Sequence, residues 1–142
     1  MATLETQKEK RAFIARLSLD YPKFTFKESS RFSFRPPKTI NYSLSDDHFA
    51  LQSLHELGHA LSGHRSFDKL VQRLKMEREA WEKARSLAPQ YDIDWNEDYI
   101  EDQLDTYRDW LHQKSKCPSC GQTRYQNKAG IWLCPNCDNL AN

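Results

Sequence analysis

Residues 53–64, SLHELGHALSGH, bring three histidines and one glutamate into one short stretch. Within it, His55, Glu56 and His59 form the pattern His-Glu-x-x-His. On a helix, the two imidazoles lie one turn apart on the same face and can both reach one Zn²⁺, with the glutamate close to the metal's water. The pattern predicts metal-assisted hydrolysis with Glu56 as general base. The alternative is a helix whose histidines are solvated or hydrogen-bonded.

A catalytic zinc site needs a third protein ligand and an open position for water. Glu77, Glu79 and His64 are the candidates. Helical spacing predicts that Glu77 lies in the apolar seam of the next helix and that Glu79 points toward solvent. A buried carboxylate needs a partner, so Glu77 should bind a metal or pair with an arginine of a neighbouring helix. His64 follows His59 one residue too early for the metzincin pattern, and we expect it to pack or hydrogen-bond near the site.

All 4 cysteines fall in two Cys-x-x-Cys pairs near the C-terminus. In CPSCGQTRYQNKAGIWLCPNC, the span between the pairs suits a hairpin with its turn at 127–130. This spacing predicts a zinc ribbon with a closed, tetrahedral, structural site, and it favours zinc over two redox-active cysteine pairs. The predicted ligands are Cys117, Cys120, Cys134 and Cys137. We therefore expect two zinc ions per chain, one catalytic and one structural.

The hairpin between the cysteine pairs also carries basic and aromatic residues, namely Arg124, Tyr125, Lys128 and Trp132. Such residues could form a contact surface for nucleic acid or for a substrate protein. Four residues are a weak electrostatic signal. A ribbon that only closes the C-terminal part of the fold, with Trp132 packed on the hairpin, is an equal alternative.

The segment before the motif must hold it in place, and its pattern predicts a surface helix followed by three short strands. The helix covers residues 4–19, and the strand patterns centre on residues 24–26, 32–34 and 40–42. Apolar and polar residues alternate in each strand, and Pro36 and Pro37 break the second from the third. We expect a small antiparallel meander.

Three further helices are predicted. The motif helix should start at Ser45, where a hydroxyl and two following carboxylates favour a helix N-terminus. A second helix should run from about 68 to 87 and end before Pro89, and a third should begin near Asn96. With the meander and the ribbon, these elements predict an α+β fold.

The composition agrees with a small globular protein, because 142 residues with 29% charged side chains suit one compact domain with a small appendage. We expect a metallopeptidase domain over residues 1–113 and a zinc ribbon over 114–142. The net charge of +1 gives no general argument for nucleic-acid binding. The N-terminus has scattered charges and no apolar run spans a bilayer, so we expect a cytoplasmic protein without membrane contact.

The segment KTINYSLSDDHFALQSLHELGHALSGH resembles the ImmA/IrrE family of zinc metallopeptidases. The downstream EREAW resembles that family's Glu-x-x-Ala-[Asn/Asp] segment, which implies Glu77 as the third ligand. Trp81 stands where the family usually has a small polar residue. The resemblance covers roughly residues 4–88 and implies a zincin-like fold. It also implies an endopeptidase whose substrate is a repressor-like, DNA-binding protein.

Several parts of the expected reaction stay open at this stage. The oxyanion could be stabilised by Tyr91, Tyr99, Tyr107 or His64. An extended substrate could pair with the strand over residues 38–42.

Two other functions compete with the ImmA/IrrE-like peptidase. One is an SprT-like protease acting on DNA-bound proteins, a family that uses a third histidine. The other is a non-catalytic zinc-binding adaptor, which would have no need of Glu56 beside an intact ligand pair.

Overall fold

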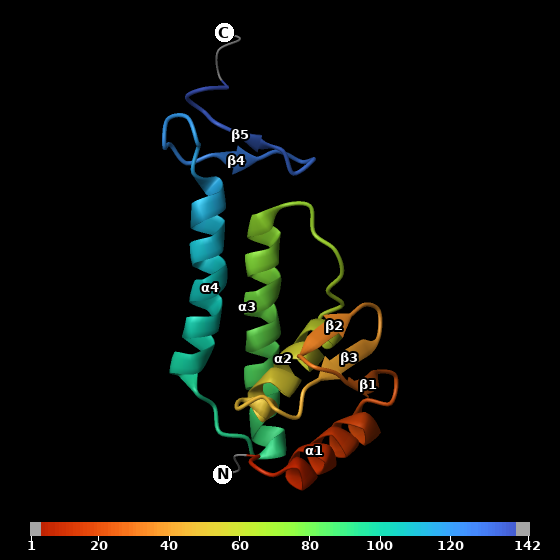
Figure 1. Ribbon diagram of the computed structural model, residues 1–142. Coiled ribbons are helices and arrows are strands. Elements are labelled where there is room, and N and C mark those ends of the chain that lie inside the picture. Colours follow the sequence, from red (N-terminus) through yellow and green to blue (C-terminus); the bar gives the residue numbers. More distant parts are fainter. Residues whose placement is uncertain (1–3, 139–142) are drawn as a thin grey trace. The chain divides into compact units, whose positions relative to one another are not determined.

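The computed structural model describes residues 4–138 and has an α+β architecture with two small sheets (Figure 1). This agrees with the predicted fold class. In chain order, the elements are α1 (Gln7–Asp20), β1 (Thr25–Glu28), β2 (Ser33–Arg35), β3 (Thr39–Tyr42), α2 (Phe49–Leu61), α3 (Leu70–Leu87), the 3₁₀ helix η1 (Ala88–Tyr91), α4 (Glu97–Ser115), β4 (Tyr125–Gln126) and β5 (Trp132–Leu133).

The chain forms two compact units. Of the described residues, the first unit contains 4–65 together with 78–96, and the second contains 66–77 together with 97–138. Helix α3 contributes to both, since the division falls between Glu77 and Arg78. The sequence predicts two domains that fold independently, with a boundary at residue 113. The compact units do not test independent folding, so this boundary stays a prediction. No helix within residues 4–138 is long and apolar enough to cross a membrane.

Helix α1 forms as predicted but begins at Gln7, because Thr6 caps it. The Thr6 hydroxyl accepts from the backbone N–H of Glu9, and the Glu9 carboxylate accepts from the backbone N–H of Thr6. This reciprocal pair satisfies two backbone donors that a helix start otherwise leaves open. The buried face of α1 consists of Lys10, Phe13, Ile14 and Leu17.

The three strands form where the sequence predicts them, but the predicted meander is wrong. The sheet order is β1-β3-β2, with β1 parallel and β2 antiparallel to β3. The strand TINY carries no charge and its Ile40 is fully buried, so β3 takes the central place. The outer strands carry Lys27, Glu28 and Arg35, and charged residues are typical of sheet edges.

The sequence predicts Ser45 as the cap of the motif helix, so its first residue would be Asp46. Helix α2 instead begins at Phe49, three residues later. Ser45 is not the cap; its hydroxyl pairs with Ser43, and an Asp46 carboxylate oxygen accepts from the backbone N–H of His48. The loop before α2 is held by Lys10 of α1, whose ammonium group donates to the Leu44 carbonyl at 2.7 Å. This buried lysine fixes the start of the motif helix, and hydrophobic patterning alone does not predict it.

Helix α2 is the central element of the first unit. It lies against β2 and β3 and contacts α1 (Figure 1). Every residue from Phe49 to Ala60 is buried except Gln52, which is half-buried. The apolar stripe and the histidine face are therefore both enclosed, whereas sequence periodicity only separated the two faces.

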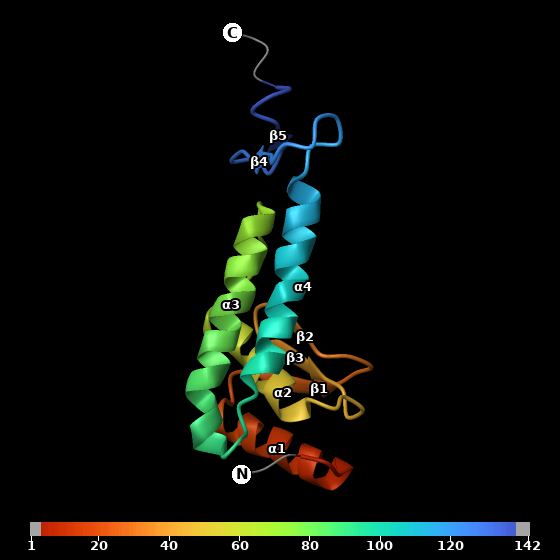
Figure 2. The same ribbon diagram turned by 90° about the vertical axis from the view of Figure 1, so that its left-hand side faces the viewer.

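In the second unit, the β4–β5 hairpin lies beyond the C-terminal end of α4 (Figure 2). The turn is where the sequence predicts it: the backbone N–H of Gly130 donates to the carbonyl of Asn127, and that of Asn127 donates to the carbonyl of Ile131. Gln126 accepts from the backbone N–H of Leu70 at 2.5 Å. The hairpin is thus tied to the first residue of α3.

Candidate metal centres

Helix α2 carries all three polar residues of the motif. His55 and His59 are four residues apart, about one helical turn, and Glu56 directly follows His55. His55, Glu56 and His59 are all buried. The Nε2 atoms of the two histidines are 3.2 Å apart, and Oε1 of Glu56 is 3.9 Å from Nε2 of His55. An imidazole nitrogen without hydrogen can bind a metal, so these two nitrogens can share one ion while Glu56 stays beside them.

Glu77 completes a group of three candidate ligands. Its ligand atom and those of His55 and His59 all lie within 4.8 Å of one another. Glu77 is 2% exposed, whereas the Glu79 side chain is 40% exposed, as the helical spacing predicts. Glu77 ends the segment 66–77, and Arg78 follows it on the same helix. These three residues could hold a metal ion.

Aromatic rings enclose the two histidines within the first unit. Trp81 stacks on His55, with ring centroids 4.1 Å apart and planes 28° apart. Phe34 of β2 lies parallel to His59, with centroids 6.5 Å apart. The tryptophan that departs from the ImmA/IrrE pattern therefore packs directly on a candidate ligand, an interaction that the motif comparison does not reveal.

Glu77 also has an arginine and a tyrosine as neighbours. Nη2 of Arg73 lies 3.4 Å from Oε1 of Glu77 and donates to the Tyr107 hydroxyl at 3.2 Å. Burial and the hydrogen bond with Glu77 raise the pKa of Tyr107. The ion pair weighed from the sequence is therefore present, but the arginine comes from the preceding turn of the same helix. The i,i+4 spacing of Arg73 and Glu77 is the signal that could have revealed it.

His64 is not one of the three grouped ligands. Its Nδ1 lies 2.9 Å from Nδ1 of His59, the ring nitrogen of His59 that does not face His55. Its Nε2 lies 3.4 Å from a carboxylate oxygen of Glu79. The expectation that His64 hydrogen-bonds near the site is confirmed, and Glu79 is found to be its partner.

Among the tyrosines considered for the oxyanion, Tyr91 has a structural contact elsewhere. Its hydroxyl donates to Asp20 at 2.7 Å, and burial followed by this hydrogen bond raises its pKa. Tyr107 instead lies beside Glu77. Of these two, Tyr107 is the one placed next to a candidate ligand.

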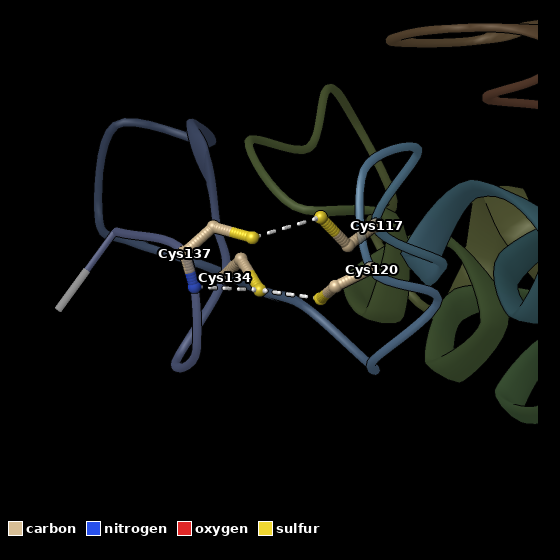
Figure 3. Close-up of side chains that lie close together, drawn as sticks. All are labelled: Cys117, Cys120, Cys134 and Cys137. Carbon is tan, nitrogen blue, oxygen red and sulfur yellow. Dashed lines mark hydrogen bonds between the residues drawn. The ribbon is translucent and has the colours of Figure 1, made fainter.

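The four cysteines form a second group that could hold a metal ion. Their sulfur atoms point toward one another from the two Cys-x-x-Cys turns (Figure 3). The Cys117–Cys137 sulfurs are 3.9 Å apart and the Cys120–Cys134 sulfurs are 3.6 Å apart. A disulfide needs about 2.05 Å between sulfurs, so these are free cysteines gathered around a common centre.

Backbone amides around the cysteines favour thiolates. The N–H groups of Cys120 and Ser119 donate to the Cys117 sulfur and lower its pKa to about 6. The N–H group of Gln122 likewise lowers the pKa of Cys120. Hydrogen bonds with Cys120, Cys117 and Cys134 instead raise the pKa of Cys137. The thiolate is the metal-binding form, so two of the four thiols are prepared for a cation and Cys137 must lose its proton when one binds.

The hairpin residues considered as a contact surface do not share one face. In the β4–β5 register, Tyr125 lies opposite Leu133 and Gln126 lies opposite Trp132, so Tyr125 and Trp132 point to different sides. The Arg124 guanidinium lies over the Trp132 ring at 5.1 Å and donates to the Lys114 carbonyl at 2.6 Å. Trp132 and Arg124 thus pack on the ribbon itself.

None of the protein-family models, curated proteins or solved structures compared with this chain matches it. The resemblance to the ImmA/IrrE family therefore stays a prediction from its residues.

Proposed function

We propose that the chain is a zinc-dependent endopeptidase, with His55, His59 and Glu77 as ligands of the catalytic ion. The observation that carries the proposal is the buried Glu56 carboxylate, which lies 3.9 Å from Nε2 of His55 and outside the three-ligand group. Three ligands suffice to hold a catalytic zinc ion. A second buried carboxylate that lies beside them and is not itself a ligand is what a general base requires.

Ligand spacing supports zinc as the metal. Two nitrogens at about 2.05 Å from one ion, at corners of a regular tetrahedron, are about 3.3 Å apart. The histidine nitrogens are 3.2 Å apart. Four sulfurs at about 2.3 Å from one ion are about 3.8 Å apart, and the Cys117–Cys137 and Cys120–Cys134 distances of 3.9 and 3.6 Å lie on either side of this value. We therefore propose two zinc ions per chain, the second one structural.

Glu56 would accept a proton from the attacking water and pass it to the leaving amine. Zinc, when bound, lowers the pKa of water and polarises the scissile carbonyl. The Tyr107 hydroxyl and the Arg73 guanidinium are both in contact with Glu77, and we propose them as donors for the oxyanion.

The strand available to an extended substrate differs from the one expected. β3 is hydrogen-bonded on both sides, so strand addition at residues 38–42 is wrong. β2 is an edge strand, and its Phe34 packs parallel to His59. We propose that a peptide segment of the substrate pairs with the outer edge of β2, which brings its backbone alongside the ligand histidines. A regulatory, repressor-like protein stays the proposed substrate on the resemblance alone.

One observation favours the non-catalytic adaptor. The contacts of Glu77 with Arg73 and Tyr107 give this carboxylate partners without any metal. Metal counting separates the two functions. Two zinc ions per chain, one of them lost in His55→Ala, would support the peptidase, whereas a single zinc held by the cysteines would favour the adaptor.

The SprT-like alternative needs a third histidine ligand. His64 contacts Nδ1 of His59, the nitrogen that does not face His55.

The test of catalysis is Glu56→Gln in the full chain loaded with zinc. A general base contributes about 10²–10⁴-fold to the rate, so this variant should keep two zinc ions and lose hydrolysis by that factor. The assay uses a mixed library of quenched fluorescent peptides, followed by a pull-down in which Glu56→Gln retains uncleaved protein from cell extract. Glu82→Gln, an exposed change on α3, is the matched control. Equal cleavage by wild type and Glu56→Gln, with zinc retained, would remove Glu56 from this role.

A further inference from the structure

His59 has neighbours at both of its ring nitrogens. Nε2 faces His55 at 3.2 Å and Nδ1 faces His64 at 2.9 Å. A neutral imidazole carries a hydrogen on only one of its two nitrogens. If Nε2 is to bind a metal, the hydrogen must reside on Nδ1. In that form, His59 donates through Nδ1 to His64.

This donation fixes the hydrogen of His64 as well. Nδ1 of His64 must be the bare, accepting nitrogen, so a neutral His64 carries its hydrogen on Nε2. That nitrogen lies 3.4 Å from Oε2 of Glu79. An ionised carboxylate can only accept, so Glu79 favours a hydrogen on Nε2 of His64. The three side chains thus form a directed series from Glu79 through His64 to His59.

The end of α2 explains how His64 reaches His59. Gly63 adopts φ 68°. The N–H of Gly63 donates to the Ala60 carbonyl, and that of His64 donates to the His59 carbonyl. This pair of bonds is the Schellman arrangement, which ends a helix at a left-handed glycine and folds the next residue back over the last turn. The left-handed Gly63 therefore places His64 in contact with His59.

We propose that His64 and Glu79 are positioning residues that hold His59 in the tautomer with hydrogen on Nδ1, so that Nε2 is presented to the metal. The inference rests on the metal site of the proposed function but not on peptide hydrolysis. Hydrogen bonds to the second nitrogen of a ligand histidine fix its tautomer and orientation, and their loss typically weakens metal binding by about 10–100-fold. His55 is oriented differently, by stacking on Trp81.

The first measurement is the tautomer of His59 in the metal-free full chain, read from ¹⁵N–¹H NMR correlations of the neutral ring. Wild type should show hydrogen on Nδ1. In His64→Ala, both tautomers should be populated, because the nitrogen that accepts from Nδ1 is removed. His64→Asn places an amide oxygen near the position of the lost nitrogen and should restore the wild-type tautomer. A side chain with only a packing role would not move this signal.

The second measurement is zinc affinity of the histidine site, by chelator competition with the cysteine site loaded. We expect about 10–100-fold weaker binding in His64→Ala and recovery to within a few-fold in His64→Asn. Glu79→Gln should give a smaller loss, because an amide can donate as well as accept. Glu82→Gln, exposed on the same helix, should match wild type.

Two results would overturn the proposal. One is an unchanged His59 tautomer and unchanged zinc affinity in both His64→Ala and Glu79→Gln. The other is a His64→Asn variant in which His59 keeps its hydrogen on Nδ1 but zinc binds as weakly as in His64→Ala. That result would make His64 a ligand. Neither measurement needs turnover. A failure of the endopeptidase proposal would therefore appear separately, as a wild type that cleaves no peptide although His59 carries its hydrogen on Nδ1 and the histidine site binds zinc tightly.

Discussion

Gly58 of α2 lies directly against the backbone of Ala80 in α3, so closely that a Cβ on Gly58 would overlap the Ala80 carbonyl oxygen. Gly58 is one of the two unspecified positions of the His-Glu-x-x-His motif. The close approach brings the helix that carries the two histidines against the helix that carries Glu77. The glycine is therefore required by helix packing.

Gly58→Ala should destabilise the protein although alanine is the better helix former. The added methyl meets backbone atoms that cannot move aside, and overpacking of this kind costs about 1–3 kcal/mol. Thermal or urea unfolding measures the change, and zinc binding at the histidine site should weaken with it. Ser62→Ala, an exposed change at the end of the same helix, is the matched control. A gain in stability in Gly58→Ala would contradict the close packing.

Trp81 should contribute to metal binding by holding the His55 ring. Trp81→Phe keeps an aromatic face and should bind zinc within a few-fold of wild type, whereas Trp81→Ala removes the ring that stacks on His55 and should bind about 10-fold more weakly. Chelator competition on folded protein measures both. If Trp81→Ala folds and binds zinc as tightly as wild type, the stacking has no part in preparing the site.

Gln126 should tie the ribbon to the start of α3. Its side chain accepts from the N–H of Leu70 and donates to the Gly130 carbonyl at 2.7 Å. Gln126→Ala removes both bonds and should cost about 1–2 kcal/mol and speed amide hydrogen exchange at Leu70. Gln122→Ala, at an exposed position of the same ribbon, is the control. Unchanged exchange at Leu70 would argue against the tie.

The cysteine site should lose its metal as the pH falls. The folded-state pKa of Cys117, about 6, lies below its ordinary value of 9.0. A lowered pKa stabilises the folded form fully above pH 9, and this contribution is lost as the pH falls through about 6. The lowered pKa of Cys117 should therefore favour zinc retention at neutral pH, and the ribbon should unfold when zinc is released at lower pH. Metal release and circular dichroism followed together measure this, with Cys117→Ser expected to release zinc at higher pH. Release from wild type already near pH 8 would contradict the thiolate stabilisation.

Local patterns were enough to predict most elements and both groups of candidate ligands. The spacing of His55 and His59, and that of the cysteine pairs, depends only on helix and hairpin geometry, so the predicted residues do gather. The burial of Glu77 was predicted for the same reason, since it follows the apolar period of its helix. Whether these groups bind zinc and cleave peptides stays a prediction.

The sequence by itself thus determined which side chains share a helix face or a turn, because those relations are set over a few residues. Only the tertiary structure decided relations between distant segments. β3 is the central strand because pairing on two sides favours its uncharged residues. The edge strand near His59 is therefore β2 and not β3. Trp81 reached His55, and Glu79 reached His64, because α3 packs closely on Gly58. Such contacts depend on which helices meet, and no local period encodes that.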